Sequence, residues 1–451
     1  MYGRRRVGKT FLIRSVLGPE TVLEVTGIQH ATTAVQMANF RTACRRSFPE
    51  FTFSDQWPSW LEAFEELRSA LETLALSEAK PVVFLDELPW LATRRSGFLQ
   101  ALGHFWNSWA VTQRIMLVVC GSAASWMINK VVNDRGGLHN RVTRLMQLIP
   151  FTLAETDDFC RSRNVRFTPY QTVQVYMTFG GVPMYLDQLS PGLSAMQNIR
   201  AVCFAADGYL YDEFDRLFAS LFTQHERHVQ LVRVLAEKRS GLSRAEIVTA
   251  LDAHSGGGLT RVLSELVAAG FISRFVSFGR SSKEAVYRLT DPYVLFYLTF
   301  LEKRRGRQLP TDLTDLPQWN TWSGYAFENV WLTHIPALRR ALQIGDVSAE
   351  VSTFYRRSDG EQEGLQVDLL IDRRDQTINL CETKFTRDPL RLSAKLVRQL
   401  QNRRSLFEYH TGTRKNILTT LLTTYEPLGG PELQSGVDRT VTVDALFAGA
   451  S

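Results

Sequence analysis

The first ten residues contain the pattern that most restricts what this chain can fold into. They match the phosphate-binding loop G-x-x-x-x-G-K-[ST] at every fixed position. In such a loop, backbone N–H groups surround phosphate oxygens, the lysine reaches the β and γ oxygens, and the threonine hydroxyl faces Mg²⁺ at a helix N-terminus. The alternative is a tail rich in glycine and arginine. The pattern favours a nucleotide site, and its predicted residues are Gly3, Val7, Gly8, Lys9 and Thr10.

A phosphate-binding loop normally follows a buried β-strand, and only Met1 and Tyr2 precede Gly3 in this sequence. We therefore expect the natural protein to start about ten residues earlier, with an apolar strand that ends next to Tyr2. Such a strand would pair with its sheet neighbours and hold Gly3 at the carboxyl edge of the sheet.

Composition sets the broad class of protein. The chain has 451 residues, of which 44% are hydrophobic and 22% charged, as in a globular protein of several domains. A net charge of +6 points to a polyanionic partner, or to arginine spread over a solvated surface. Five cysteines without a C-x-x-C pair favour neither a disulfide framework nor a zinc site, so we expect a reducing cytoplasm. No apolar run reaches the roughly 18 residues of a transmembrane helix, so no membrane contact is expected.

Residues 81–87 (PVVFLDE) form a second nucleotide signature. An apolar run that ends in two acids predicts a buried parallel strand with both carboxylates at the sheet's carboxyl edge. Asp86 would then hold the Mg²⁺ shell, and Glu87 would orient and deprotonate the attacking water. Any strand can end in two acids, so the signature gains its weight from the phosphate-binding loop.

Two further residues are candidates for the same site. Residues 115–122 predict another apolar strand, and Ser122 at its end is a candidate sensor between the acids and the γ-phosphate. The alternative for Ser122 is an ordinary strand-to-helix turn. Arg141 is a candidate arginine finger, acting in cis or from a neighbouring subunit, and the alternative is a surface arginine.

The middle of the chain predicts two helical regions. Paired glycines before Pro183 mark a bend within the first, residues 156–224. Residues 225–290 read as helix, turn, helix and a basic wing, with S-R-A-E at 243–246 as a capping box. This winged-helix pattern suits contacts to DNA phosphates, or protein packing alone. Its basic residues are Arg261, Arg274, Arg280 and Lys283.

The last region contains a second cluster of charges. A helix is expected to open at Gly324, and a hairpin centred on Asp375 places Asp368 opposite Glu382 at about 4.5–5.5 Å between Cβ atoms. Lys384 shares that face. Two facing acids and a lysine suit Mg²⁺-dependent phosphodiester cleavage, in which the acids bind metal and the lysine helps activate water. The alternative is a salt bridge around Lys384.

Four segments together carry a family resemblance: YGRRRVGKT at 2–10, FLDE at 84–87, GS at 121–122 and GGVP at 180–183. The chain resembles the prokaryotic ATPases of the STAND/AAA+-like archaeal family. The resemblance implies binding of ATP and Mg²⁺, followed by a winged helix and a domain similar to PD-(D/E)xK nucleases. It further implies that the nuclease positions are Glu328, Asp368, Glu382 and Lys384.

The predicted fold is α/β: a P-loop NTPase parallel sheet with a helical lid, then a winged helix-turn-helix, then an α/β nuclease-like domain. The predicted function is a Mg-ATP hydrolase coupled to DNA binding or processing, and self-association into a homo-oligomer is compatible with it. The alternatives are a nucleotide-regulated DNA-binding or signalling protein with an inactive C-terminal domain, and an interaction scaffold with a dead ATP site. The predicted boundaries are 1–155 for the ATPase core, 156–224 for the lid, 225–290 for the winged helix, 291–314 for a linker and 315–451 for the nuclease-like domain.

Overall fold

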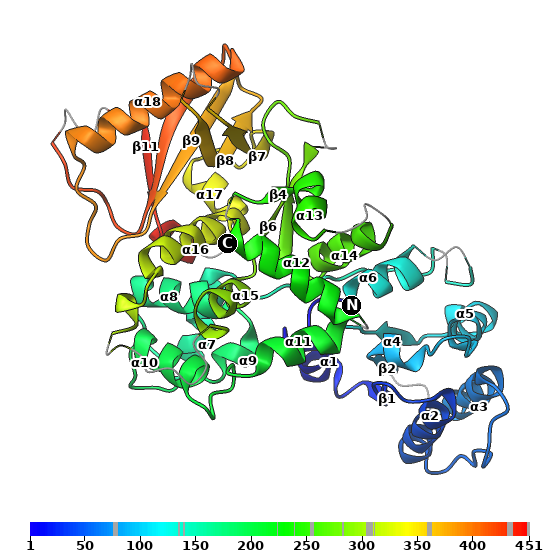
Figure 1. Cartoon of the computed structure of the whole chain (residues 1–451). Coiled ribbons are helices and arrows are strands. Elements are labelled where there is room, and N and C mark those ends of the chain that lie inside the picture. Colours follow the sequence, from blue (N-terminus) through cyan, green and yellow to red (C-terminus); the bar gives the residue numbers. More distant parts are fainter. Residues whose placement is uncertain are drawn as a thin grey trace. The chain divides into compact units, whose positions relative to one another are not determined.

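A computed structural model of the chain forms two compact units, Met1–Ile149 and Pro150–Ser451 (Figure 1). The first boundary lies close to the predicted end of the ATPase core, and the other predicted boundaries stay predictions. The structure describes residues 1–74, 80–133, 136–138, 140–222, 224–238, 240–252, 257–281, 284–303, 310, 312–358, 363–430 and 436–448.

The first unit alternates helices and strands, and its predicted elements are confirmed. Helix α1 follows the phosphate-binding loop directly, and β2 and β3 are the strands predicted to carry Asp86 and Ser122. The elements are α1 (Lys9–Leu17), β1 (Thr21–Thr26), α2 (Thr33–Ser47), α3 (Trp60–Glu72), β2 (Val82–Asp86), α4 (Leu88–Leu91), α5 (Phe98–Ser108), β3 (Met116–Val119) and α6 (Ala124–Met127).

A parallel sheet of three strands, in the order β1-β2-β3, organises the first unit. Strand β2 is buried at all five positions, because apolar side chains cover both of its faces. Tyr2 pairs in parallel with both Gly121 and Gln147, and its carbonyl accepts from Leu148 N at 2.8 Å. The residue before the loop is thus held by sheet-like pairing on two sides, which fixes where the loop begins.

The tryptophan-rich helix α3 is part of the core of the first unit. Trp60 is 1% exposed and packs edge-on against Phe40 and Phe98, with ring centroids 5.4 and 4.7 Å apart. Edge-to-face packing is a favourable arrangement for aromatic pairs. The helix therefore packs against α2 and α5 in the core of the first unit.

The second unit contains helices, a small antiparallel sheet and a larger mixed sheet. Its elements are α7 (Leu153–Ser162), α8 (Pro169–Phe179), α9 (Pro183–Leu186), α10 (Ala195–Ile199), α11 (Glu213–Leu221), α12 (His225–Glu237), β4 (Leu242–Ser243), α13 (Arg244–Ala250), α14 (Gly257–Ala268), β5 (Ile272–Phe275), β6 (Val286–Leu289), α15 (Pro292–Phe296), α16 (Trp319–Thr333), α17 (Ile335–Ala341), β7 (Ala349–Arg356), β8 (Leu365–Arg373), β9 (Thr377–Lys384), α18 (Ala394–Thr411), β10 (Asn416–Thr423), β11 (Arg439–Thr442) and α20 (Asp444–Phe447).

The part of the second unit predicted to be a winged helix contains three helices and a small antiparallel sheet. Helices α12, α13 and α14 accompany an antiparallel sheet in the order β4-β6-β5. The predicted capping box is confirmed, because the Ser243 side chain accepts from Glu246 N while the Glu246 carboxylate accepts from Ser243 N. Lys283, predicted on the wing, lies outside the described residues.

The C-terminal sheet has the order β11-β10-β9-β8-β7 and mixes parallel with antiparallel pairs. Strands β8 and β9 form the predicted hairpin, and their register (Leu369 opposite Cys381, Leu370 opposite Leu380) is the one centred on Asp375. The paired residues end at Leu369 and Cys381, one position before Asp368 and Glu382, so the predicted pair of these two acids stays a prediction. The predicted helix start at Gly324 is wrong, since α16 begins at Trp319.

One hydrophobic core runs through the second unit, from Leu153 to Leu446. It includes buried side chains of the helices after residue 150, of the winged helix and of the C-terminal sheet. The winged helix and the C-terminal sheet therefore share packing. In the described part of the chain, no helix combines the length and apolarity that crossing a bilayer requires.

Candidate nucleotide site and the C-terminal carboxylates

The phosphate-binding loop ends in a helix whose first N–H groups have no side-chain cap. Gly8 is the N-cap residue of α1 and has a φ of 89°, a backbone conformation that glycine adopts without strain. Val7 is buried and anchors the loop. A helix that starts this way leaves its N-terminal N–H groups available to an anion.

Lys9 lies inside the loop. Its ammonium donates to the carbonyls of Gly3 and Arg4 at 2.9 and 2.8 Å, and to Ser122 Oγ at 3.1 Å. Burial lowers the pKa of Lys9, while the nearby Glu87 carboxylate opposes this shift. The loop is thus folded around the Lys9 ammonium group. A bound polyphosphate would compete with the two loop carbonyls and Ser122 for that positive charge.

The two predicted acids lie next to the loop. Thr10 Oγ1 donates to Asp86 Oδ2 at 2.7 Å, although 76 residues separate the two in the sequence. The other Asp86 oxygen accepts from Glu87 N at 2.9 Å. Glu87 has a φ of 47°, in the left-handed region that non-glycine residues rarely occupy. Such outliers cluster at functional sites, because the surrounding structure has to hold them there.

Ser122 joins the lysine to the second acid. Its hydroxyl donates to Glu87 Oε1 at 2.5 Å and its backbone N–H donates to Glu87 Oε2 at 3.1 Å. Since Lys9 also donates to the same hydroxyl, the order of contacts is Lys9, Ser122, Glu87. The structure therefore brings Lys9, Thr10, Asp86, Glu87 and Ser122 together, and their catalytic roles stay predictions.

These residues fit a Mg²⁺-nucleotide complex. Mg²⁺ in proteins is bound by one or two carboxylates together with substrate phosphates and water. The Thr10 hydroxyl and the Asp86 carboxylate, already in contact, supply that donor set beside the loop. When bound, the ion would neutralise charge on the phosphates while Lys9 and the α1 N-terminus hold them.

Arg141 is not brought into this group of contacts. Among the described residues, it makes no hydrogen bond to Lys9, Asp86, Glu87 or Ser122; its side chain is exposed. It lines an apolar pocket of about 410 Å³ beside β3. Its role as an arginine finger, in cis or from a neighbouring subunit, stays a prediction.

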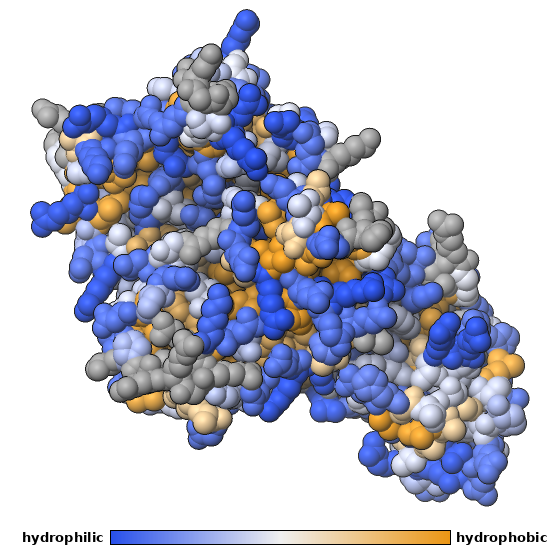
Figure 2. Space-filling model, viewed as in Figure 1, coloured by the Kyte–Doolittle hydropathy of each residue, from blue (hydrophilic) through white to orange (hydrophobic). Residues whose placement is uncertain are grey.

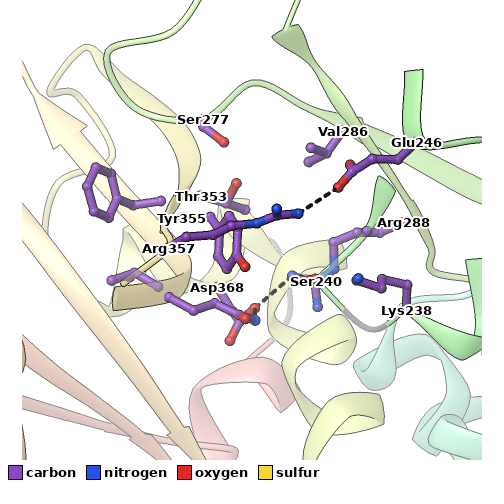
Figure 3. Close-up of a pocket in the computed structure, with 14 residues that line it drawn as sticks. Lys238, Ser240, Glu246, Ser277, Val286, Arg288, Thr353, Tyr355, Arg357 and Asp368 are labelled. Carbon is purple, nitrogen blue, oxygen red and sulfur yellow. Dashed lines mark hydrogen bonds and ion pairs between the residues drawn. The ribbon is translucent and has the colours of Figure 1, made fainter. Parts of the chain in front are cut away.

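The predicted C-terminal acids are neighbours, but they surround an arginine. Arg288 of β6 places Nη1 at 3.1 Å from Asp368 Oδ1 and Nη2 at 3.3 Å from Glu328 Oε2 (Figure 3 shows the Asp368 pair). Its side chain is 1% exposed. Burial and the Asp368 carboxylate raise the pKa of Glu328 to about 8, against the opposing effect of Arg288.

The third acid is paired as well. Glu382 Oε1 accepts from Lys384 Nζ at 2.6 Å, and Glu382 Oε2 lies 3.3 Å from an Arg403 nitrogen. In the described part of the chain, no three histidine, cysteine or acidic side chains converge as a metal site would need. Each of the three acids predicted as metal ligands, Glu328, Asp368 and Glu382, therefore contacts a side-chain cation in this structure, and their role as metal ligands stays a prediction.

Sequence reasoning missed Arg288 and Arg403. Arg288 precedes Glu328 by 40 residues and Asp368 by 80, so nothing local connects them. The one available signal was an arginine within the otherwise apolar run V-Y-R-L at 286–289. A charge inside such a strand needs a buried partner.

The comparisons with known proteins agree with the N-terminal site. Residues 1–189 match the family model described as "ATPase domain predominantly from Archaea". This part of the chain is therefore a P-loop ATPase domain of that archaeal type. The match ends before the winged helix, so the second unit beyond residue 189 lies outside it.

Individual relatives are distant. An uncharacterized protein of Methanocaldococcus jannaschii is 20% identical over 393 residues, which are 85% of this chain and 82% of that protein. A Walker-type ATPase of Pyrococcus abyssi is 17% identical with a TM-score of 0.45, covering 66% of this chain and 90% of that one. The ORC2 protein of Aeropyrum pernix is 15% identical with a TM-score of 0.30, covering 67% and 87%. Similarities of this size do not identify a substrate.

Proposed function

We propose that this protein binds Mg-ATP at the phosphate-binding loop and hydrolyses it. The observation that carries the proposal is the contact between Thr10 and Asp86, joined to the Lys9–Ser122–Glu87 series. Lys9 and the N-terminus of α1 bind the phosphates, and Thr10 with Asp86 holds the magnesium shell. Glu87 accepts a proton from the attacking water, while Ser122 fixes the orientation of its carboxylate.

Glu87→Gln is expected to bind ATP with nearly unchanged affinity and to hydrolyse it about 10²–10⁴-fold more slowly. The amide keeps the size of the side chain but cannot act as a general base. Binding is measured with a fluorescent ATP analogue, and turnover by phosphate release. Glu50→Gln, at an exposed position, is the matched control. Unchanged turnover in Glu87→Gln would remove this residue from the proposed role.

We further propose that the winged helix contacts DNA through its phosphates only. The support is the arrangement of α12, α13 and α14 with the small sheet, and exposed arginines at Arg261 and Arg280. Each of these arginines has a carboxylate near it: Glu265 lies 3.7 Å from Arg261, and Glu284 lies 2.9 Å from Arg280. Figure 2 shows hydrophobic residues on the face over these helices. Val267 of α14 is 38% exposed. Because each of these arginines is paired with a carboxylate and the nearby surface is partly apolar, we expect weak contacts to DNA phosphates and no sequence-specific contacts to the bases.

DNA affinity should therefore fall with salt, with a slope of about −0.9 per phosphate neutralised. Arg261→Glu together with Arg280→Glu should weaken binding equally for unrelated sequences. Arg46→Glu, at an exposed end of α2, makes a single comparable change in the first unit and serves as control. Fluorescence anisotropy with two unrelated duplexes measures both effects. Binding that ignores salt and the double variant would assign the winged helix to protein packing.

A further inference from the structure

The position of Arg288 is unusual for an arginine. It is 1% exposed, while the two carboxylates that it contacts, Glu328 and Asp368, are each 23% exposed. Its Nε atom has no hydrogen-bond partner among the described residues. A buried donor without a partner is costly, so packing alone does not account for an arginine here. We therefore attribute the presence of arginine at position 288 to its positive charge.

The two carboxylates converge on that charge from separate elements. Glu328 lies on α16 and Asp368 on β8, and both direct an oxygen at the same guanidinium. Two acids that face one point normally require a cation between them, since like charges in a partly buried place repel each other. Carboxylate oxygens are also the ligands of hard divalent ions. The arginine stands where such an ion would be bound.

The strand that carries Arg288 is firmly attached to the C-terminal region. Tyr325 Oη donates to Leu289 O at 3.0 Å, and Asn329 Nδ2 donates to the same carbonyl at 3.3 Å. The Arg288 guanidinium lies 5.0 Å from the Tyr325 ring centroid, within the range of a cation–π contact. These contacts keep Arg288 in place between the acids.

A small cavity borders the same ion pair. Its volume is about 60 Å³, and Arg288 and Asp368 are among its lining residues (Figure 3). On the other side of the cavity, Arg357 pairs with Glu246 at 3.4 Å. Water and a small ion can therefore come close to the Asp368 carboxylate without a rearrangement of the backbone.

We propose that Arg288 is a built-in cation that takes the place of a divalent metal ion between Glu328 and Asp368. The carboxylate pair then binds a divalent ion only after the arginine charge is removed. The winged helix, through β6, supplies the charge that the C-terminal acids need. In this arrangement Arg288 occupies the space between the two acids, and the C-terminal region binds no metal ion there.

The test measures the binding of Mn²⁺ to the full chain in the absence of nucleotide. Electron paramagnetic resonance detects the Mn²⁺ that remains free. The parent chain used for comparison and every variant carry Asp86→Asn, which removes the predicted metal ligand of the ATP site. Arg288→Met should bind Mn²⁺ at least about tenfold more tightly than the parent chain. Arg288→Lys keeps a positive charge and should resemble the parent. Adding Asp368→Asn to Arg288→Met should abolish the gained binding.

Thermal melting gives a second readout. Arg288→Met should melt below the parent, because Asp368 loses its counter-charge and the Glu328 carboxyl loses a buried hydrogen-bond donor, and Mn²⁺ should raise its melting temperature but not that of the parent. Combining Arg288→Met with Glu328→Gln and Asp368→Asn removes all three charges and should recover stability even if the single variant fails to fold. Arg261→Met, on the surface of α14, is the matched control.

Three results would overturn the proposal. The first is Mn²⁺ binding by the parent chain that Asp368→Asn abolishes, since the ion and the arginine would then coexist. The second is a folded Arg288→Met variant that binds no more Mn²⁺ than the parent. The third is a triple variant that melts no higher than Arg288→Met. None of these results depends on ATP hydrolysis.

Discussion

Lys9→Met is expected to abolish ATP-dependent turnover and to weaken ATP binding by roughly 10- to 150-fold. The range corresponds to the loss of a charge-assisted contact of about 1.5–3 kcal/mol. The lost stabilisation of charge on the transferred phosphoryl group adds to the effect on turnover. Methionine keeps the length and apolar character of the lysine side chain. The fold around the loop is therefore preserved better than in an alanine variant.

The structure makes this test more specific than the motif alone does. Lys9 contacts two loop carbonyls and Ser122 Oγ, so its loss frees the loop as well as the phosphate site. Melting temperature should accordingly be measured beside ATP affinity. Lys130→Met, at an exposed position, is the control for loss of one positive charge. A Lys9→Met variant that hydrolyses ATP at the parent rate would contradict the assignment of the site.

Gly3→Ala is expected to destabilise the first unit by about 2–3 kcal/mol or more and to reduce ATP affinity at the same time. A Cβ atom at residue 3 would lie 2.1 Å from the Leu148 carbonyl oxygen, a backbone atom that no side-chain movement can clear. Leu148 N also donates to Tyr2 O at 2.8 Å. Relieving the clash must therefore disturb the pairing that positions the loop.

Gly324→Ala is the matched control for that substitution. An added Cβ at residue 324 meets no atom within 4 Å, and the residue lies inside α16. Alanine should therefore stabilise this helix, by about 0.5–1 kcal/mol. Circular dichroism melting of both variants gives the comparison. A Gly3→Ala protein that melts like the parent would show that the loop tolerates a shift at residue 3.

Several features of this protein could be predicted because the determining residues are close in sequence. The phosphate-binding loop is a run of eight residues, Gly3 to Thr10, whose backbone conformation depends on its own glycines. The capping box at Ser243 and Glu246 is a contact across three residues. The pairing of Leu369 with Cys381 follows from alternation along two strands and from a turn centred on Asp375.

Other features depended on contacts that no local pattern encodes. Helix α16 starts at Trp319, where the N-cap residue Gln318 has a φ of 71° and provides no side-chain cap, so the usual start signal is missing. The left-handed backbone of Glu87 is imposed by its surroundings. Whether Ser122 contacts Glu87 depended on how two neighbouring strands end.

The sequence by itself determined that the chain has a phosphate-binding loop, two acids at the end of a buried strand and two facing acids in a hairpin. Only the tertiary structure decided which side chains those acids contact. Asp86 accepts from the Thr10 hydroxyl, while Asp368 and Glu328 contact Arg288 from a strand far away in the sequence. The physical reason is that a carboxylate's chemistry is set by the hydrogen-bond donors and cations nearest to it. In a folded chain, that neighbour is chosen by long-range packing.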